Sequence, residues 1–399
     1  MSVKITVDLF KSGKLTPVGC RICGGELVPA LSAVKLGDTG NTFTCVGYSQ
    51  SAGRYVACDG DGFFVSSDGL RFIRLADSHG RAFAAEEVYE GQIRAVMFGG
   101  TSCFTHTGTQ FVTYSNPVDL YCGVMHCGRL FAIDAQNRYL LRWSASGVKN
   151  WEEGMKGAGS LVLDPVRGPA SDILSYGGTL VIVRKYGLTV AKMYGSPENF
   201  SVYATDTDCD EIYEKTARTV LGRLYFYTAS GLKYFDGAVI RGVKHRLSED
   251  ICAPACGEEY GGNYFLCCSK KTGGEAVLVY SPEDGESYFA DGGADCMCAC
   301  GGVRIYRGGE AFKLDGGGEY TLTAEGIDFG TDGAKTLLSL KLTGEGADVC
   351  VSNGRQSIVY KRARGVIRPR LRGRSFTVEV RGTAKVRSLT ATAEAVNEI

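Results

Sequence analysis

Residues 221–237 read LGRLYFYTASGLKYFDG, and this stretch decides the fold of the chain. Two apolar runs, residues 224–227 and 232–235, are too short for helices and are separated by Ser230-Gly231, which favours a tight hairpin turn. Strands of this length cannot bury their apolar faces alone and must pack against neighbouring copies of the unit. The stretch therefore predicts a repeating β-hairpin.

The same pattern recurs along the first three-quarters of the chain. Residues 176–190 match the quoted unit element for element, and the other copies centre on residues 55–58, 94–98, 130–133, 264–267 and 303–306. Their starts are roughly 35 to 50 residues apart, a spacing typical of propeller blades. We expect an all-β chain in which residues 1–317 form a β-propeller of about seven blades. The opening strand, residues 3–10, could pair with the last blade and close the ring.

The spacing ends near residues 316–320, where a second region begins. About six short apolar or alternating segments follow, from residues 320–323 to residues 386–391. Six strands are enough for a small sandwich. We therefore expect a separate β-sandwich-like domain at residues 318–399.

The composition bounds the class of protein. The 44 basic and 44 acidic residues cancel, so no global field attracts nucleic acid or an acidic membrane. The 55 glycines suit many tight turns. No segment approaches a membrane-spanning length of apolar residues, and nothing resembles a signal peptide. We expect no membrane span, and folding in a reducing cytoplasm with most of the 16 cysteines as thiols.

Groups that could carry chemistry are scattered, and each has a simpler interpretation. Cys20 and Cys23 have the spacing of half a zinc site, but zinc needs four ligands and no second pair is matched to them. Cys296, Cys298 and Cys300 share one strand face and more simply pack as small apolar side chains. The acidic run at residues 206–211 lacks the glycine and glutamate of a calcium loop. Nothing links a histidine to a nucleophile or carboxylate; the four are His79, His106, His126 and His245. We expect no metal, no cofactor and no catalytic residue.

One turn supports an alternative function. Residues 66–72 read SSDGLRF, which is similar to the Asp-box turn of sialidase-type propellers. The alternative is a carbohydrate-binding or sialidase-like propeller, in which some of the 21 tyrosines could stack on sugars. The simpler explanation is a hairpin whose Asp68 caps its own turn.

The strongest charge feature lies near the C-terminal end. Seven basic residues fall within fourteen positions without an acidic residue between them: Lys361, Arg362, Arg364, Arg368, Arg370, Arg372 and Arg374. They could contact phosphates or an acidic partner protein. Equally, they could protect an edge strand from pairing with other chains.

Residues 138–237 carry a family resemblance. The order of Arg142-Trp143-Ser144, Trp151 and the two hairpins after them resembles the tail hub or nozzle proteins of short-tailed phages, also described as phage stabilisation proteins. The chain is shorter than many such nozzles and richer in cysteine.

The resemblance implies a structural virion component of the tail or head–tail connector, assembled in the cytoplasm of the host bacterium. It implies a homo-oligomeric ring around the DNA exit path that contacts other tail or connector proteins. Non-specific contact with the genomic DNA is possible in such a ring, and no catalytic site is expected. Arg142, Trp143 and Trp151 are then candidate contact residues, together with the arginines of residues 362–374.

Overall fold

The computed structural model describes residues 2–11, 14–23, 25–77, 81–89, 92–106, 111–145, 150–203, 207–245, 247, 250–316 and 318–396. These residues are nearly all β, with two 3-10 turns, η1 (Met155–Gly157) and η2 (Pro197–Asn199), and no α-helix among them. None of their helical segments could cross a membrane. The chain divides into two compact units, which we call unit 1 (Met1–Ser32 with Asp315–Ile399) and unit 2 (Ala33–Leu314).

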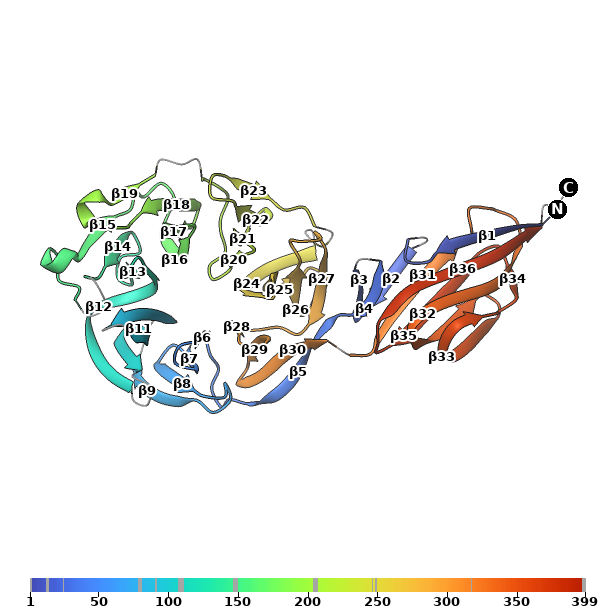
Figure 1. Cartoon of the computed structure of the whole chain (residues 1–399), viewed down its shortest axis with the longest axis horizontal. Helices are drawn as coiled ribbons and strands as arrows, with labels where there is room; N and C mark the ends of the chain where they lie inside the picture. Colours follow the sequence, from blue (N-terminus) through green and yellow to red (C-terminus); the bar gives the residue numbers. More distant parts are fainter. Residues whose placement is uncertain are drawn as a thin grey trace. The chain divides into compact units, whose positions relative to one another are not determined.

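Unit 2 is a ring of antiparallel sheets (Figure 1). The first sheet along the chain has four strands: β6 (Cys45–Ser49), β7 (Arg54–Cys58), β8 (Gly62–Ser66) and β9 (Ile73–Asp77). A six-stranded sheet follows it. The six-stranded sheet contains β10 (Ala82–Tyr89), β11 (Gln92–His106), β12 (Phe111–His126), β13 (Arg129–Asp134), β14 (Leu140–Trp143) and β15 (Gly159–Val162).

Two four-stranded sheets follow. One contains β16 (Ala170–Tyr176), β17 (Thr179–Arg184), β18 (Gly187–Lys192) and β19 (Ser201–Val202). The other contains β20 (Arg218–Val220), β21 (Arg223–Thr228), β22 (Gly231–Phe235) and β23 (Ile240–Gly242). The hairpin predicted at residues 221–237 is formed by β21 and β22.

An eight-stranded sheet completes the ring and joins two sets of strands. The first set is β24 (Ile251–Tyr260), β25 (Asn263–Lys270), β26 (Glu275–Tyr280) and β27 (Ser287–Asp291). The second is β28 (Cys296–Ala299), β29 (Val303–Arg307) and β30 (Glu310–Gly316), with β5 (Leu31–Asp38) beside β30. The all-β propeller predicted from the repeats is confirmed. The seven repeats fall into six sets of strands in the described residues, because residues 94–98 and 130–133 share the six-stranded sheet.

The alternation within β21 explains how neighbouring sheets hold together. Leu224 and Phe226 pack with β17 and β18 on one side, whereas Tyr225 and Tyr227 pack with β25 and β26 on the other. Both faces of the strand are therefore buried, which is why its sequence is an almost unbroken apolar run. Burying each of these aromatic side chains stabilises the propeller by about 2–3 kcal/mol.

The strand that completes the last set differs from the one expected. β5, at residues 31–38, lies beside β30, and Lys35 forms an ion pair with Glu310 at 2.5 Å. The amide of Thr39 donates to the Gly309 carbonyl at 2.8 Å. The expected closing strand, residues 3–10, instead lies in β1 (Ser2–Asp8) and the turn after it, and β1 pairs with β36 (Val386–Val396) of unit 1. The expectation that residues 3–10 close the propeller was therefore wrong.

Unit 1 is one network of ten strands around a single apolar core. Its strands from the N-terminal segment, besides β1, are β2 (Lys14–Val18), β3 (Cys20–Cys23) and β4 (Glu26–Pro29). Those from the C-terminal segment, besides β36, are β31 (Tyr320–Ile327), β32 (Lys335–Ser352), β33 (Ser357–Ile367), β34 (Leu371–Gly373) and β35 (Phe376–Gly382).

The long strand β32 organises unit 1. Its first half pairs with β36 and its second half with β35, and a register shift near Gly344 separates the two halves. Gly344 has φ +135° and approaches the Lys385 carbonyl so closely that a Cβ there would lie 2.5 Å from it. Only glycine fits this bend. The strands form one connected sheet, so a two-layer sandwich remains a prediction.

The predicted boundary between the two domains needs a correction at the N-terminal side. The change of spacing in the sequence predicts a propeller at residues 1–317 and a second domain at residues 318–399. In the structure, Met1–Ser32 belongs to unit 1. The propeller is thus an insertion between two segments of unit 1, and the change of spacing near residues 316–320 marks its C-terminal end.

Candidate functional site

The arginines of residues 362–374 form an extended basic edge of unit 1. We call Arg362, Arg364, Arg368, Arg370, Arg372 and Arg374 the arginine edge. Strands β33 and β34 follow one another along β32, with Ile367 opposite Leu340 and Leu371 opposite Leu337. The whole segment therefore runs antiparallel to one strand, and its arginines are spread along that strand's length.

All six side chains of the arginine edge are exposed. The neighbouring Lys361 pairs with Asp348 at 2.7 Å, and the Arg362 amide donates to the same carboxylate at 2.8 Å. Within the part of the chain that the structure describes, no ion pair involves the side chains of the arginine edge. Their charges are left to solvent and to whatever binds there.

The zero net charge of the chain hides a separation of charge between the units. Unit 1 contains 17 lysines and arginines against 12 acidic residues, which makes it +5. Unit 2 contains the remaining 27 basic and 32 acidic residues and is −5. Guanidinium groups bind phosphate and carboxylate oxygens through paired hydrogen bonds. The arginine edge can therefore bind a polyanion, although the net charge of the chain gives no sign of it.

The other predicted contact residues lie inside unit 2. Trp143 is 8% exposed, packs on Phe131 and Phe200, and donates from Nε1 to the Gly157 carbonyl at 3.0 Å. Trp151 is 6% exposed and belongs to the core cluster around Val96 and Leu130. Their burial corrects the expectation that these rings contact partners.

Arg142 is half-buried and engaged within the same sheet. Its Nε donates to Asp134 at 2.6 Å, and a terminal nitrogen lies 3.7 Å from Glu153. The carboxylates neutralise most of its charge. The Arg-Trp-Ser motif thus has a packing role in this chain.

The cysteine pattern is explained by packing. Cys296 and Cys298 are buried in a cluster with Phe43 and Tyr306, and burial raises the pKa of both thiols well above its usual value. They are neutral, apolar side chains under physiological conditions. Cys20 is buried in the core of unit 1 and donates to the Thr321 carbonyl at 3.4 Å. The side chain of Cys23 lies outside the described residues, as does that of Cys103.

The acidic run at residues 206–211, which is similar to part of a calcium loop, forms ion pairs with basic side chains. Asp208 binds Arg167, Asp210 binds Lys233, and Glu211 lies 3.4 Å from Lys185. Asp206 lies outside the described residues. No group of metal-binding side chains occurs in the residues described.

One histidine contacts a serine hydroxyl, a contact that no sequence motif predicts. The Nδ1 of His126 lies 2.8 Å from Ser175 Oγ, and its Nε2 lies 3.6 Å from the Cys127 sulfur. Burial lowers the pKa of His126, so the ring is neutral near pH 7. A serine nucleophile needs a base that a third group orients, and here a thiol, not a carboxylate, faces the second nitrogen. His79 and the side chain of His106 lie outside the described residues.

The turn similar to an Asp-box is an Asp-capped hairpin. Asp68 accepts from the amides of Leu70 and Arg71 at 2.8 and 2.9 Å and from the Ser66 hydroxyl at 2.9 Å. These bonds lower the pKa of Asp68. Its carboxylate is occupied by its own turn, as the simpler interpretation stated.

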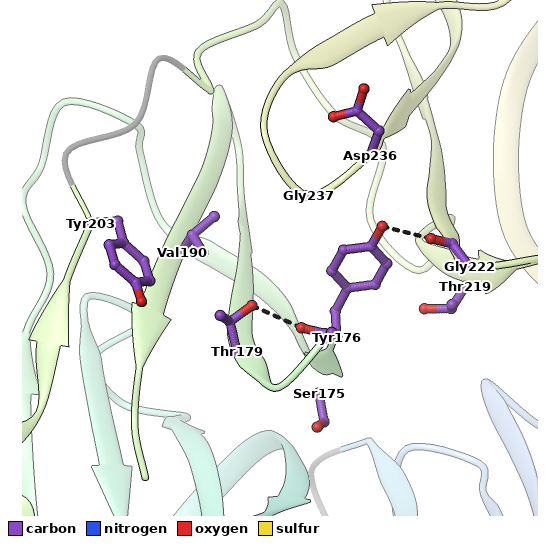
Figure 2. A pocket seen from close by; sticks show the side chains of 10 residues that line it. Ser175, Tyr176, Thr179, Val190, Tyr203, Thr219, Gly222, Asp236 and Gly237 are labelled. Atoms are coloured by element: carbon purple, nitrogen blue, oxygen red, sulfur yellow. Dashed lines mark hydrogen bonds between the residues drawn. The ribbon is translucent and has the colours of Figure 1, made fainter.

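A cavity of about 650 Å³ lies between the sheets β16–β19 and β20–β23, at their hairpin turns (Figure 2). Its walls are mostly hydroxyl groups, tyrosine rings and glycines: Ser175, Tyr176, Gly177, Thr179, Val190, Tyr203, Thr219, Gly222, Asp236 and Gly237. Figure 2 shows the rings of Tyr203 and Tyr176 on opposite sides of the cavity. Sequence patterns did not predict this site, because its residues come from four strands, β16, β17, β18 and β20, and from the connections between strands of two sheets. Tyr176-Gly177, at the turn between β16 and β17, and Gly222, at the turn between β20 and β21, hold matching places in two repeats.

Comparisons with known proteins show similarity of fold alone. No protein-family model matches the chain, and no curated protein matches it. A structure of the mitotic checkpoint complex is 8% identical with a TM-score of 0.44, over 75% of this chain and 93% of that one. The extracellular domain of the putative one-component system BT4673 from B. thetaiotaomicron is 10% identical with a TM-score of 0.49, over 94% and 62%. BBS1N, in complex with ARL6DN, is 9% identical with a TM-score of 0.47, over 72% and 98%. Propellers serve many functions, so these likenesses favour none.

Proposed function

We propose that this chain is a structural virion component of a bacteriophage or prophage-derived tail or head–tail connector. It assembles as a homo-oligomeric ring in the cytoplasm of the host and binds neighbouring tail proteins. The arginine edge is the observation that carries the proposal, since it offers an exposed surface for an acidic partner or for DNA in the tail. The resemblance of residues 138–237 to tail hub and nozzle proteins supplies the context.

The residue type of the edge supports binding more than simple protection of a strand. A solvent-exposed edge can be protected by any charge, and lysine is the usual choice. Here six of the seven bases in the segment are arginines, whose planar guanidinium groups bind phosphates or carboxylates in a paired geometry. Six like charges along one edge also repel each other until an anion neutralises them.

The interior of unit 2 supports a role without catalysis. Within the described residues, the groups that the sequence singled out are engaged in the fold: Asp68 caps a turn, Asp208 and Asp210 pair with Arg167 and Lys233, and Cys296 and Cys298 are core thiols. Ser175 and His126 form a pair without an orienting carboxylate. The repeated hairpins form the wall of the propeller, and their common residues are turn and packing residues, not reactive groups.

The test compares two triple variants in the parent phage. Arg364→Gln/Arg368→Gln/Arg372→Gln removes three charges from the arginine edge, whereas Lys4→Gln/Lys14→Gln/Lys341→Gln removes three exposed charges from elsewhere in unit 1. We expect the arginine variant to be depleted from purified particles and the lysine variant to be incorporated like the wild type. Immunoblots of particles and electron microscopy of tails give the readout. Tail preparations that lack this chain, or equal incorporation of both variants, would overturn the proposal.

A further inference from the structure

Two hydroxyl groups on the wall of this cavity, those of Tyr176 and Thr179, are available as hydrogen-bond acceptors. The Tyr176 hydroxyl donates to the Gly222 carbonyl at 2.7 Å, and the Thr179 hydroxyl donates to the Tyr176 carbonyl at 2.8 Å (Figure 2). With their protons used in this way, both oxygens are left to accept hydrogen bonds. Burial raises the pKa of Tyr176, so its hydroxyl stays neutral. At these two positions a ligand must therefore bring donors.

Asp236 adds a fixed carboxylate to the same wall. Its Oδ1 accepts from the amides of Ala238 and Val239 at 3.0 Å each, and its Oδ2 accepts from Arg241 Nε at 3.1 Å. The Val239 and Ala238 amides, followed by Arg241, lower the pKa of Asp236 to about 2. A carboxylate has about four acceptor positions, so at least one remains available for a ligand.

The charge around Asp236 decides between two kinds of donor ligand. A cation would suit a carboxylate, but Arg241 already pairs with Asp236, and Arg223 also interacts with it electrostatically. The site therefore has no surplus negative charge to attract an ammonium or guanidinium group. A neutral ligand rich in hydroxyl groups fits better.

The apolar part of the wall suits a flat, partly apolar ligand. The side chain of Tyr203 is 41% exposed, and Val190 and Tyr176 are buried beneath the cavity surface. A sugar ring presents an apolar face of C–H groups and an edge of hydroxyl donors, which matches an aromatic ring beside acceptors. The volume of about 650 Å³ is in the range of small-molecule sites and admits one to three sugar units.

We propose that the cavity between the sheets β16–β19 and β20–β23 binds a neutral saccharide, with Tyr203 stacking on the sugar ring and Asp236 and Thr179 accepting from its hydroxyls. Ser175, which also lines the cavity, has its hydroxyl 2.8 Å from His126 Nδ1. This site goes beyond the structural role proposed above and uses no residue of the arginine edge.

The experiment is saturation-transfer NMR of the full chain with glucose, galactose, N-acetylglucosamine and their di- and trisaccharides, followed by titration calorimetry of those that respond. We expect Tyr203→Ala to weaken binding at least about tenfold and Tyr203→Phe to change it less than about threefold, because the phenyl ring keeps the stacking surface. Asp236→Asn is expected to weaken binding by a similar factor. Tyr194→Ala is the matched control, since Tyr194 is 46% exposed but does not line the cavity.

Three results would overturn the proposal. The first is no saturation transfer from any of these sugars at millimolar concentration. The second is binding that persists unchanged in both Tyr203→Ala and Asp236→Asn, with circular dichroism confirming that the variants are folded. The third is binding of arginine methyl ester in preference to the sugars, which would assign the cavity to a cation. None of these results depends on particle assembly, so failure here leaves the proposed function standing.

Discussion

Arg184 is fully buried in unit 2, and its guanidinium hydrogen-bonds the chain between β15 and β16. Its Nε donates to the Gly168 carbonyl at 2.7 Å, and a terminal nitrogen donates to the Asp164 carbonyl at 2.6 Å. The other terminal nitrogen lies 3.3 Å from the Thr189 hydroxyl. One side chain thus ties a loop and two strands together. Burial lowers the pKa of Arg184, yet an arginine remains charged, so these acceptors are needed.

We predict that Arg184→Met destabilises the chain by about 2–4 kcal/mol, because it leaves buried carbonyl groups without donors. Chemical denaturation followed by tyrosine and tryptophan fluorescence measures the change. Arg223→Met is the control, since Arg223 is exposed, and we expect a change within about 0.5 kcal/mol. Equal losses in both variants would contradict the role assigned to Arg184.

His126 and His245 make stability depend on pH. Burial lowers the pKa of both rings below the ordinary value of 6.5, so the unfolded chain binds protons more readily than the folded one. Their contribution is complete above the unfolded pKa and is lost as pH falls below about 6.5 toward the folded pKa values.

We predict that the free energy of unfolding decreases between about pH 7 and pH 5, by at most about 1.4 kcal/mol per pH unit for each histidine. Urea denaturation at several pH values gives the slope. His126→Gln is expected to reduce the slope in this window, and an unchanged slope would show that His126 already titrates normally in the folded chain.

At the scale of elements, β5 completes the last set of strands from a distant part of the chain. It lies between β27 and β30, so backbone amides on both of its edges take part in pairing. Its side chains contribute little burial, and Val34 is 51% exposed. The strand is held by its ladder and by Lys35 with Glu310.

We predict that Val34→Pro lowers stability by about 3 kcal/mol or more, because proline removes an amide donor from the interior of a sheet. Val34→Thr keeps the amide and a β-branched side chain, and it serves as the control with an expected loss below about 1 kcal/mol. Thermal unfolding measured by calorimetry compares the two. A proline variant as stable as the threonine variant would show that β5 is dispensable for the ring.

Some of these elements can be predicted from the sequence and others cannot. The hairpins were predictable because turn, strand and burial are coded within one repeat, as in residues 221–237. The identity of the closing strand, β5 instead of β1, was not predictable. Residues 3–10 and 31–38 have similar strand patterns, and which of them joins the propeller depends on partners that are distant in the sequence. The exposure of the arginine edge followed from its charges, whereas the burial of Trp143 and Trp151 depends on neighbouring strands. The cavity is lined by strands and turns of two sheets that only packing brings together.

At the scale of the whole molecule, the chain has two compact units, and the core cluster of unit 1 contains no residue from the strands β5 to β30. Each unit is large enough to unfold on its own. We predict two thermal transitions by calorimetry for the full chain. A fragment of residues 30–316, which retains β5, is expected to reproduce one of them within a few degrees. A single transition in the full chain together with an unfolded fragment would contradict this independence.

The pairing of β1 with β36 gives the chain an order of events during synthesis. The ribosome makes β1 to β4 before unit 2, but most of their partners, β31 and β36, emerge only after the 282 residues of unit 2. At translation rates of 5–20 residues per second, this delay is on the order of tens of seconds. During that time the propeller can close, while the N-terminal strands wait with unsatisfied edges. A nascent chain stalled before residue 320 should therefore recruit a holding chaperone to its first thirty residues.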